Sequence, residues 1–221
     1  MLQAFLNVFF PLECLSCDAM LDSGFQYPLC RSCQSSVVRL NASSDSTPPY
    51  VDEAWSLFRY NPPIRKLIHH FKLDHPEPTL PFLRNALTLF VAENPHLAQT
   101  YEAIVPVPSH KPFSPFERWN PNHPSRLWPT LIAEALRLPI IACIERGIRV
   151  RKQTDLGYND RIANPLNTFR LRSRSHRFQR LLLVDDVMTT GATINECARM
   201  LKATGAQQVG ALTIARVWIA N

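Results

Sequence analysis

Glycine is scarce in this sequence, and long apolar runs are absent from it. The chain has 6 glycines against 19 prolines in 221 residues. Gly191 and Gly205 both fall in its last fifth, where we expect a turn and the end of a helix. No uninterrupted apolar run approaches the roughly 20 residues that cross a bilayer, which excludes a transmembrane protein. The length suits one compact domain with a small appendage, or two small domains.

The N-terminus also lacks the marks of a secretory signal. It reads MLQAFLNVFFPLECL, with no positive n-region and no small-residue cleavage site. Its apolar residues at helical spacing, which predict a short amphipathic helix, are Leu2, Phe5, Leu6 and Phe9. We expect this helix to pack on its own protein in the cytoplasm. The alternative is weak peripheral attachment at the inner face of the cytoplasmic membrane.

Acidic residues are few in the third quarter of the chain. The net charge is +6, yet residues 137–180 hold eleven Arg or Lys against three acids, a local charge of +8. Such an excess suits a polyanionic partner, either nucleic acid or a multiply phosphorylated small molecule. The alternative is a solvated basic face.

The cysteines fall into two groups. Cys14, Cys17, Cys30 and Cys33 follow the pattern C-x2-C-x12-C-x2-C. Two such pairs can place four thiolates at the corners of one tetrahedron, which predicts a structural zinc site with no position left for a catalytic water. Without a secretory signal, disulfides are not expected. The other two, Cys143 and Cys197, lie among apolar residues and are expected to be ordinary buried thiols.

A segment rich in serine and proline, residues 41–50, is expected to be a linker. We therefore predict a zinc module over residues 1–45 and a main domain over residues 46–221. In the main domain, segments typical of strands alternate with segments typical of helices. Strands are expected at residues 54–60, 103–108, 139–143 and 181–184, and helices from residue 62 and at residues 81–93, 125–138 and after Gly191. This alternation predicts an α/β fold with a mainly parallel sheet and flanking helices.

The most specific motif is LLLVDDVMTTGAT, residues 181–193. Four apolar residues predict a central strand that is buried on both faces. Asp185 and Asp186 follow at its carboxyl end, where ligands bind in open α/β sheets. A threonine- and glycine-containing loop and a helix N-terminus then form an anion cradle, and the two acids beside it suit the hydroxyls of a sugar. The alternative is an acidic N-cap. The motif is neither a Walker loop nor a Rossmann fingerprint.

This motif resembles the phosphoribosyl pyrophosphate (PRPP) signature of type I phosphoribosyltransferases. The wider chain resembles the ComF family, late-competence proteins of naturally transformable bacteria that join a cysteine-zinc module to a phosphoribosyltransferase-like domain. The further segments that carry this resemblance are residues 60–68 with Phe71 and Lys72, the VPVP segment at 105–108, a set comprising Arg149, Arg151, Gln153, Leu156, Arg161, Asn164 and Phe169, and the pair Ala215 and Arg216.

Tryptophan at position 119 departs from the family, in which many members have glycine there, so the loop before the helix at 125–138 is expected to differ in shape.

The resemblance implies roles for individual residues. The acidic pair would hold the ribose hydroxyls and the threonine loop the 5-phosphate, with Mg²⁺ on the diphosphate. The implied PRPP-binding residues are Asp185, Asp186, Val187, Met188, Thr189, Thr190, Gly191, Ala192, Thr193, Ser109, His110 and Lys111. The candidate catalytic residues are Asp185, Asp186 and Lys152. The candidate nucleic-acid-binding residues are Arg149, Arg151, Lys152, Arg170, Arg172, Arg174, Arg177 and Arg180.

Two functions of different class remain open from the sequence. The first is a cytoplasmic protein of DNA uptake that binds single-stranded DNA and carries a PRPP-type site, with other DNA-uptake proteins as further partners. The second is a working phosphoribosyltransferase with an unknown acceptor. The local basic excess and the ComF resemblance favour the first. The intact acidic pair and threonine loop keep the second open.

Overall fold

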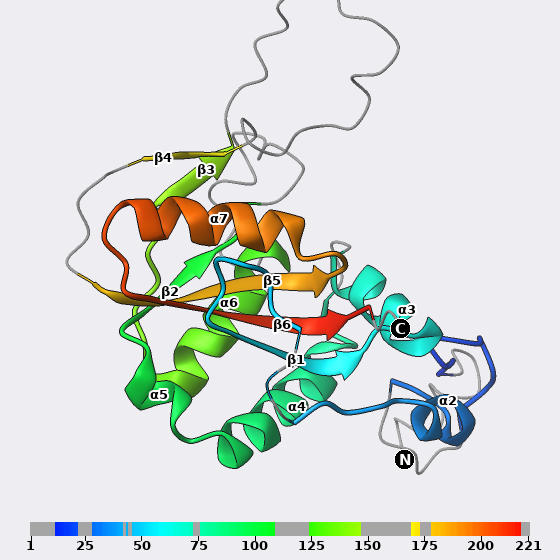
Figure 1. Ribbon diagram of the computed structural model, residues 1–221. Helices are drawn as coiled ribbons and strands as arrows, with labels where there is room; N and C mark the ends of the chain where they lie inside the picture. Colours follow the sequence, from blue (N-terminus) through cyan, green and yellow to red (C-terminus); the bar gives the residue numbers. More distant parts are fainter. Residues whose placement is uncertain are drawn as a thin grey trace, which may run out of the picture.

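A four-stranded parallel sheet forms the centre of the molecule (Figure 1). The computed structural model describes residues 12–21, 28–41, 43, 46–72, 76–108, 124–146, 169–172 and 178–217. The strand order is β1 (Glu53–Arg59), β6 (Gln208–Arg216), β5 (Arg180–Met188) and β2 (Ala103–Pro106), and every neighbouring pair is parallel. The predicted α/β fold with a mainly parallel sheet is confirmed.

The centre of β5 is buried on both faces, as the apolar run at its start predicts. Leu181, Leu182, Leu183 and Val184 are at most 1% exposed. Successive side chains point to opposite faces of the sheet, so Leu181 and Leu183 join one apolar cluster and Leu182 and Val184 the other. Because β5 needs cover on both sides, helices flank both faces of the sheet.

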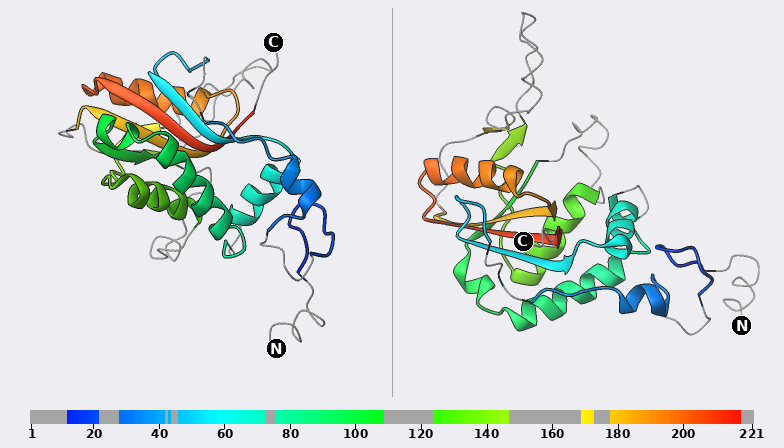
Figure 2. Two further views of the ribbon diagram at one scale, coloured as in Figure 1. Left: turned by 90° about the horizontal axis from the view of Figure 1, so that it is seen from below. Right: turned by 45° about the vertical axis from the view of Figure 1, so that its right-hand side comes forward.

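One face of the sheet carries α7 (Ala192–Ala203), and the other carries α3 (Pro62–Lys72), α4 (Leu80–Glu93) and α6 (Pro124–Leu136). Figure 2 shows α7 separated from these three helices by the strands. The helix α3 starts at a pair of prolines, which fit the first turn of a helix because its N–H groups have no partner within the helix. The short helix α5 (Leu97–Thr100) leads into β2. At the end of α7, Gly205 has a φ of +103°, as expected for a helix terminus.

The strand expected at residues 139–143 is wrong. Only Ile140 forms a bridge to Ile104 of β2, and the regular strand β3 (Ile144–Arg146) begins after this segment. This strand pairs antiparallel with β4 (Phe169–Leu171) in a separate two-stranded sheet. The chain leaves β2 early because Cys143 and Ile144 are buried in the cluster under α7.

The N-terminal part of the chain is bound closely to the main domain. Residues 38–40 run antiparallel to the end of β1, with hydrogen bonds from Leu40 N to Leu57 O at 2.9 Å and from Arg59 N to Val38 O at 2.9 Å. The short helix α2 (Arg31–Ser35) precedes them. These bonds extend the sheet beyond β1, an element that the sequence did not predict.

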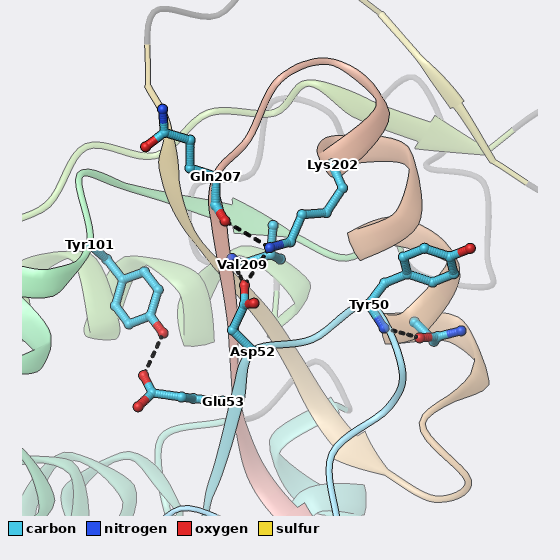
Figure 3. A network of polar contacts seen from close by, with 8 residues as sticks. Tyr50, Asp52, Glu53, Tyr101, Lys202, Gln207 and Val209 are labelled. Carbon is cyan, nitrogen blue, oxygen red and sulfur yellow. Dashed lines mark hydrogen bonds and ion pairs between the residues drawn. The ribbon is translucent and has the colours of Figure 1, made fainter.

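Much of the expected linker is an ordered strap along α7. We call residues 46–52 the strap. Its Tyr50 N donates to Asn195 Oδ1 at 2.9 Å, at the start of the helix. Its Asp52 Oδ2 accepts from Lys202 Nζ at 2.7 Å, near the end of the helix, and from Val209 N at 2.6 Å (Figure 3). The strap therefore follows the length of α7.

No helix within the described ranges has both the length and the apolar character needed to cross a membrane. The N-terminal helix expected at Leu2 to Phe9 lies outside these ranges.

Gly210 allows Tyr101 to pack against β6. A Cβ atom at position 210 would collide with the hydroxyl and ring of Tyr101, whose hydroxyl bonds to Glu53 Oε2 at 3.2 Å (Figure 3). We expect Gly210→Ala to lower the free energy of unfolding by about 1–3 kcal/mol, because overpacking forces neighbours off their rotamers. Urea unfolding would measure this. In a Tyr101→Ala background the same glycine substitution should cost almost nothing, and an undiminished cost there would contradict the clash.

Candidate functional site

The central strand β5 extends beyond its neighbour β2. The last paired residues of β2 and β5 are Pro106 and Val184, whereas β5 continues to Met188 with only β6 beside it. Asp185 and Asp186 lie on this extension. The indole Nε1 of Trp128, from α6, donates to the carbonyl of Asp185 at 3.1 Å. This bond gives the extension a hydrogen-bond partner outside the sheet.

The acidic pair is half-buried and electrostatically strained. Burial raises the pKa of Asp185 to about 7, and the negative charge of Asp186 adds to this rise. Two contacts oppose it: Asp186 N donates to Asp185 Oδ1 at 2.9 Å, and Lys72 from the end of α3 forms an ion pair with Asp186. A carboxyl group that titrates near neutral pH is typical of ligand-binding and catalytic sites.

The loop after β5 presents an open helix N-terminus. Thr189 and Thr190 are exposed, and Gly191 is the N-cap of α7 with a φ of +77°. The N-cap residue has no side chain to cap the helix, and Ala192 N donates weakly to Thr190 Oγ1 at 3.4 Å, so the other N–H groups at the start of the first turn are available to an anion. The alternative of an acidic N-cap is wrong, because the cap residue is the glycine.

Gly191 is fixed by contact as well as by conformation. A Cβ atom there would lie 2.7 Å from Cγ of Pro48 in the strap. The left-handed backbone is costly for other residues, and the strap leaves no room for a side chain. The strap therefore packs against the loop through the contact of Pro48 with Gly191.

The predicted ligand-binding residues divide into those that lie within the described ranges and those that lie outside them. Residues 185–193 all gather at the end of β5, although Met188 is only 2% exposed and packs in the core under α7. Two residues of this site, Lys72 and Trp128, were not predicted as site residues; Lys72 was signalled only by the family's tyrosine-to-lysine stretch, and Trp128 had no signal. The predicted residues that lie outside the described ranges are Ser109, His110, Lys111, Arg149, Arg151 and Lys152.

The described part of the predicted basic surface is largely ion-paired. Arg170 and Arg172 both contact Glu145, at 2.7 and 3.3 Å. Arg180 contacts Glu102 at 3.2 Å, at the opposite end of β5 from the acidic pair. Arg174 and Arg177 lie outside the described residues. Three of the eight predicted nucleic-acid contacts thus have acidic neighbours, which reduce their attraction for a polyanion.

The four N-terminal cysteines form one compact cluster. Their Sγ atoms all lie within 4.8 Å of one another, and those of Cys17 and Cys30 are 3.7 Å apart. Four sulfurs at 2.3 Å from a tetrahedral zinc ion are separated by roughly 3.8 Å, so the donor set fits this metal. The predicted four-cysteine metal site is therefore supported by geometry.

The environment of the cluster favours a thiolate at one corner. Burial raises the pKa of Cys14, but the N–H groups of Cys30, Ser16 and Cys17 together lower it to about 7. The Cys30 N–H lies 3.3 Å from the Cys14 sulfur. Burial and the neighbouring sulfurs raise the pKa of Cys33 to about 12. Further ionisation of the cluster thus needs a cation among the sulfurs.

The cluster is joined to the main core. Cys14 and Leu29 belong to the same apolar cluster as α3 and α4, with Cys30 and Cys33 packed against it. Cys143 and Cys197 are buried under α7 at 5% and 0% exposure, as predicted for ordinary core thiols.

We expect one zinc ion per chain, held by the cluster. Cys30→Ser should abolish stoichiometric zinc, measured by inductively coupled plasma mass spectrometry. It should also lower the melting temperature of the whole protein, because the cluster shares its core. Cys143→Ser is the matched control and should retain the metal. Equal zinc in both variants would contradict a four-cysteine site.

Comparisons with known proteins identify a domain and several similar proteins. Residues 135–217 match the model of the phosphoribosyl transferase domain. The chain is 28% identical over 212 residues to Competence protein F of Haemophilus influenzae, covering 92% of this chain and 90% of that one. Among solved structures, orotate phosphoribosyltransferase from Aeropyrum pernix has 18% identity and a TM-score of 0.38, with 84% of this chain and 78% of that chain covered. Purine phosphoribosyltransferase from Pyrococcus horikoshii has 15% identity and a TM-score of 0.35, with 63% and 87% covered.

The matched domain contains both the acidic pair and the loop at the start of α7, and the similarity to Competence protein F covers 92% of this chain. These two findings confirm the resemblance that the sequence motifs predict. The chain carries a phosphoribosyl transferase domain and is similar, over nearly its whole length, to Competence protein F of Haemophilus influenzae.

Proposed function

We propose that the end of β5 binds a phosphorylated ribose of the PRPP type. One observation carries this proposal: a carboxylate pair and an uncapped helix N-terminus lie at the same protruding strand end. Ribose hydroxyls donate hydrogen bonds that ionised Asp185 and Asp186 can accept. A phosphate group suits the N–H groups of α7 and the hydroxyls of Thr189, Thr190 and Thr193.

The diphosphate of PRPP would require a cation. Mg²⁺ bound to the diphosphate oxygens would neutralise its charge, and hard oxygen ligands suit this ion. Ser109, His110 and Lys111 stay predicted contacts of the diphosphate. Within the site, the protein's own contribution is to orient the ribose through the acidic pair and the 5-phosphate through the loop.

We expect Gly191→Ala to abolish binding of ribose 5-phosphate, measured by isothermal titration calorimetry. The added methyl group meets Pro48 and forces the loop out of its left-handed conformation. Asp185→Asn should weaken binding about tenfold, because it replaces a charged acceptor with a neutral one. Glu134→Gln, on the outer face of α6, is the control. Unchanged affinity in both site variants would contradict the proposed position.

Binding should also strengthen with pH. Because the pKa of Asp185 is raised to about 7, its carboxyl group is partly protonated near neutral pH. The charged groups facing it are Asp186 on the same strand and Lys72 from α3. A protonated group accepts sugar hydroxyls poorly, so affinity should rise between pH 6 and pH 8. The phosphate of the ligand also ionises, with a second pKa near 6, so Asp185→Asn should remove only the part of the rise above about pH 7, and a wild-type affinity that is flat in that range would argue against the role.

We infer that the protein acts in the uptake of DNA and binds single-stranded DNA in the cytoplasm. The supporting observations are the similarity to a protein named Competence protein F and the local charge of +8 in residues 137–180. Fluorescence anisotropy of a labelled oligonucleotide, measured against salt, tests the inference. Binding by phosphate contacts falls steeply with salt. No binding at low salt would overturn it, and a shift with PRPP and Mg²⁺ would show that the two sites are coupled.

The ion pairs of Glu145 allow a second test of DNA binding, which examines Arg170 and Arg172 directly. Glu145 contacts Arg170 and Arg172, so Glu145→Gln should release both guanidinium groups and tighten DNA binding. The slope of affinity against salt should steepen at the same time. Glu134→Gln, which releases Arg84 on another face, is the matched control. Weaker binding in Glu145→Gln would mean that Arg170 and Arg172 do not face the DNA.

A second candidate function is phosphoribosyl transfer to an acceptor. It is favoured by the acidic pair, which a transferase would use to hold the ribose while positive charge develops at its C1 atom. The candidate catalytic residues are Asp185, Asp186 and Lys152. Acceptor-dependent release of diphosphate from PRPP would establish turnover. Loss of this release in Asp185→Asn, with DNA binding unchanged, would show that the two functions are separable.

We also propose that the chain divides at residue 45 into a zinc module and a transferase-like domain. In support, the strap from Ser46 onward is bonded to α7 and β6, whereas the cysteine cluster precedes it. Residues 38–40, which pair with β1, attach the module to the domain.

A further inference from the structure

Arg216 carries a positive charge in an unusual place. It is the last residue of β6 and lies opposite Met188 of β5 in the register of the sheet. Its Nη2 atom donates to the carbonyl of Ser46 in the strap. Its Nη1 atom is buried and has no hydrogen-bond partner among the described residues. No carboxylate in the described part of the chain forms an ion pair with it.

A positive charge without an anionic partner is costly in this position. Arginine stays charged in proteins, and a guanidinium group with buried nitrogens is normally paired with an anion. A neutral carbonyl satisfies one donor but does not balance the charge. Burial lowers the pKa of Arg216, which reflects the same cost of desolvation. The side chain thus has one N–H donor without a hydrogen-bond partner and a positive charge without a counter-ion among the described residues.

The strap holds this side chain beside the candidate phosphate loop. Ser46, which accepts from Arg216, is two residues before Pro48, which packs against Gly191. Tyr50 then binds Asn195 in the first turn of α7, as the strap passes along the helix (Figure 3). Arg216, the strap and the loop therefore meet at the carboxyl end of the sheet.

The loop itself offers no charge. Its donors are backbone N–H groups and threonine hydroxyls, and Lys72, the cation at the acidic pair, is occupied by Asp186. A phosphate monoester carries close to two negative charges at neutral pH. A cation next to the loop would complete its binding.

We propose that Arg216 is a further ligand-binding residue, which donates a charge-assisted hydrogen bond from its guanidinium group to the phosphate held by residues 189–193. This inference rests on the proposed phosphoribosyl site. It adds a residue from β6 to a site otherwise built from β5 and α7, and it gives the strap a role as the support of that residue. Charge-assisted bonds of this kind are about twice as strong as neutral ones.

Two variants separate this role from a purely structural one. Arg216→Gln keeps a donor for the Ser46 carbonyl but removes the charge, whereas Arg216→Lys keeps the charge. Arg84→Gln, an exposed arginine on α4 paired with Glu134, is the matched control. The affinity of the full zinc-loaded chain for ribose 5-phosphate is measured by calorimetry, and its melting temperature with and without that ligand by differential scanning fluorimetry.

We expect Arg216→Gln to bind ribose 5-phosphate about tenfold to a hundredfold more weakly and to lose the rise in melting temperature that the ligand causes. Arg216→Lys and the control should stay within about threefold of the wild type, a window of well under 1 kcal/mol of binding free energy. If the wild type binds and Arg216→Gln binds equally well, or if Arg216→Gln does not fold, the arginine only anchors the strap and the proposal is overturned. If the wild type does not bind, the proposed function fails and this inference fails with it.

Discussion

The site depends on a difference in length between two parallel strands. β2 stops at Pro106 while β5 continues to Met188, so the last part of β5 has a strand on one side only. A buried backbone without partners would be unstable, and Trp128 supplies the missing donor. The same extension carries the acidic pair beyond the packed core and brings the following loop to the end of the sheet. If β2 were as long as β5, its side chains would occupy the space beside the two carboxylates.

The end of β5 has two regions of opposite charge side by side. The carboxylates are crowded and only partly compensated by Lys72. A short distance away, the N-terminus of α7 and Arg216 present positive character. A ligand with hydroxyls at one end and a phosphate at the other would satisfy both regions at once. In the proposed function the acidic pair and the loop would bind opposite ends of the same ligand.

The sequence predicts those parts of the molecule that are local. The C-x2-C spacing, the apolar run of β5 and the loop with Gly191 each concern a few consecutive residues, and the structure places all of them as expected. The partners of the site were not predictable in this way. Trp128 and Lys72 reach Asp185 and Asp186 from helices far away in sequence, and only packing determines that contact. The sequence predicts a linker over residues 41–50, because a segment rich in serine and proline has no apolar periodicity. The bonds of the strap to α7 are made by its backbone and by Asp52, and such bonds leave no pattern of apolar residues.

The order of the strands also determines when the protein can assemble during synthesis. β1 lies near the start of the chain but pairs with β6 near its end, and Ser56 and Thr213, which share a buried hydrogen bond, are 157 positions apart. Long-range parallel pairs of this kind form late because a large loop must close first. The cysteine cluster belongs to the same apolar cluster as α3 and α4, which are synthesised long before β6. A nascent chain of this protein therefore exposes the edge of β1 that pairs with β6 for most of its translation, and chaperones have their longest opportunity there.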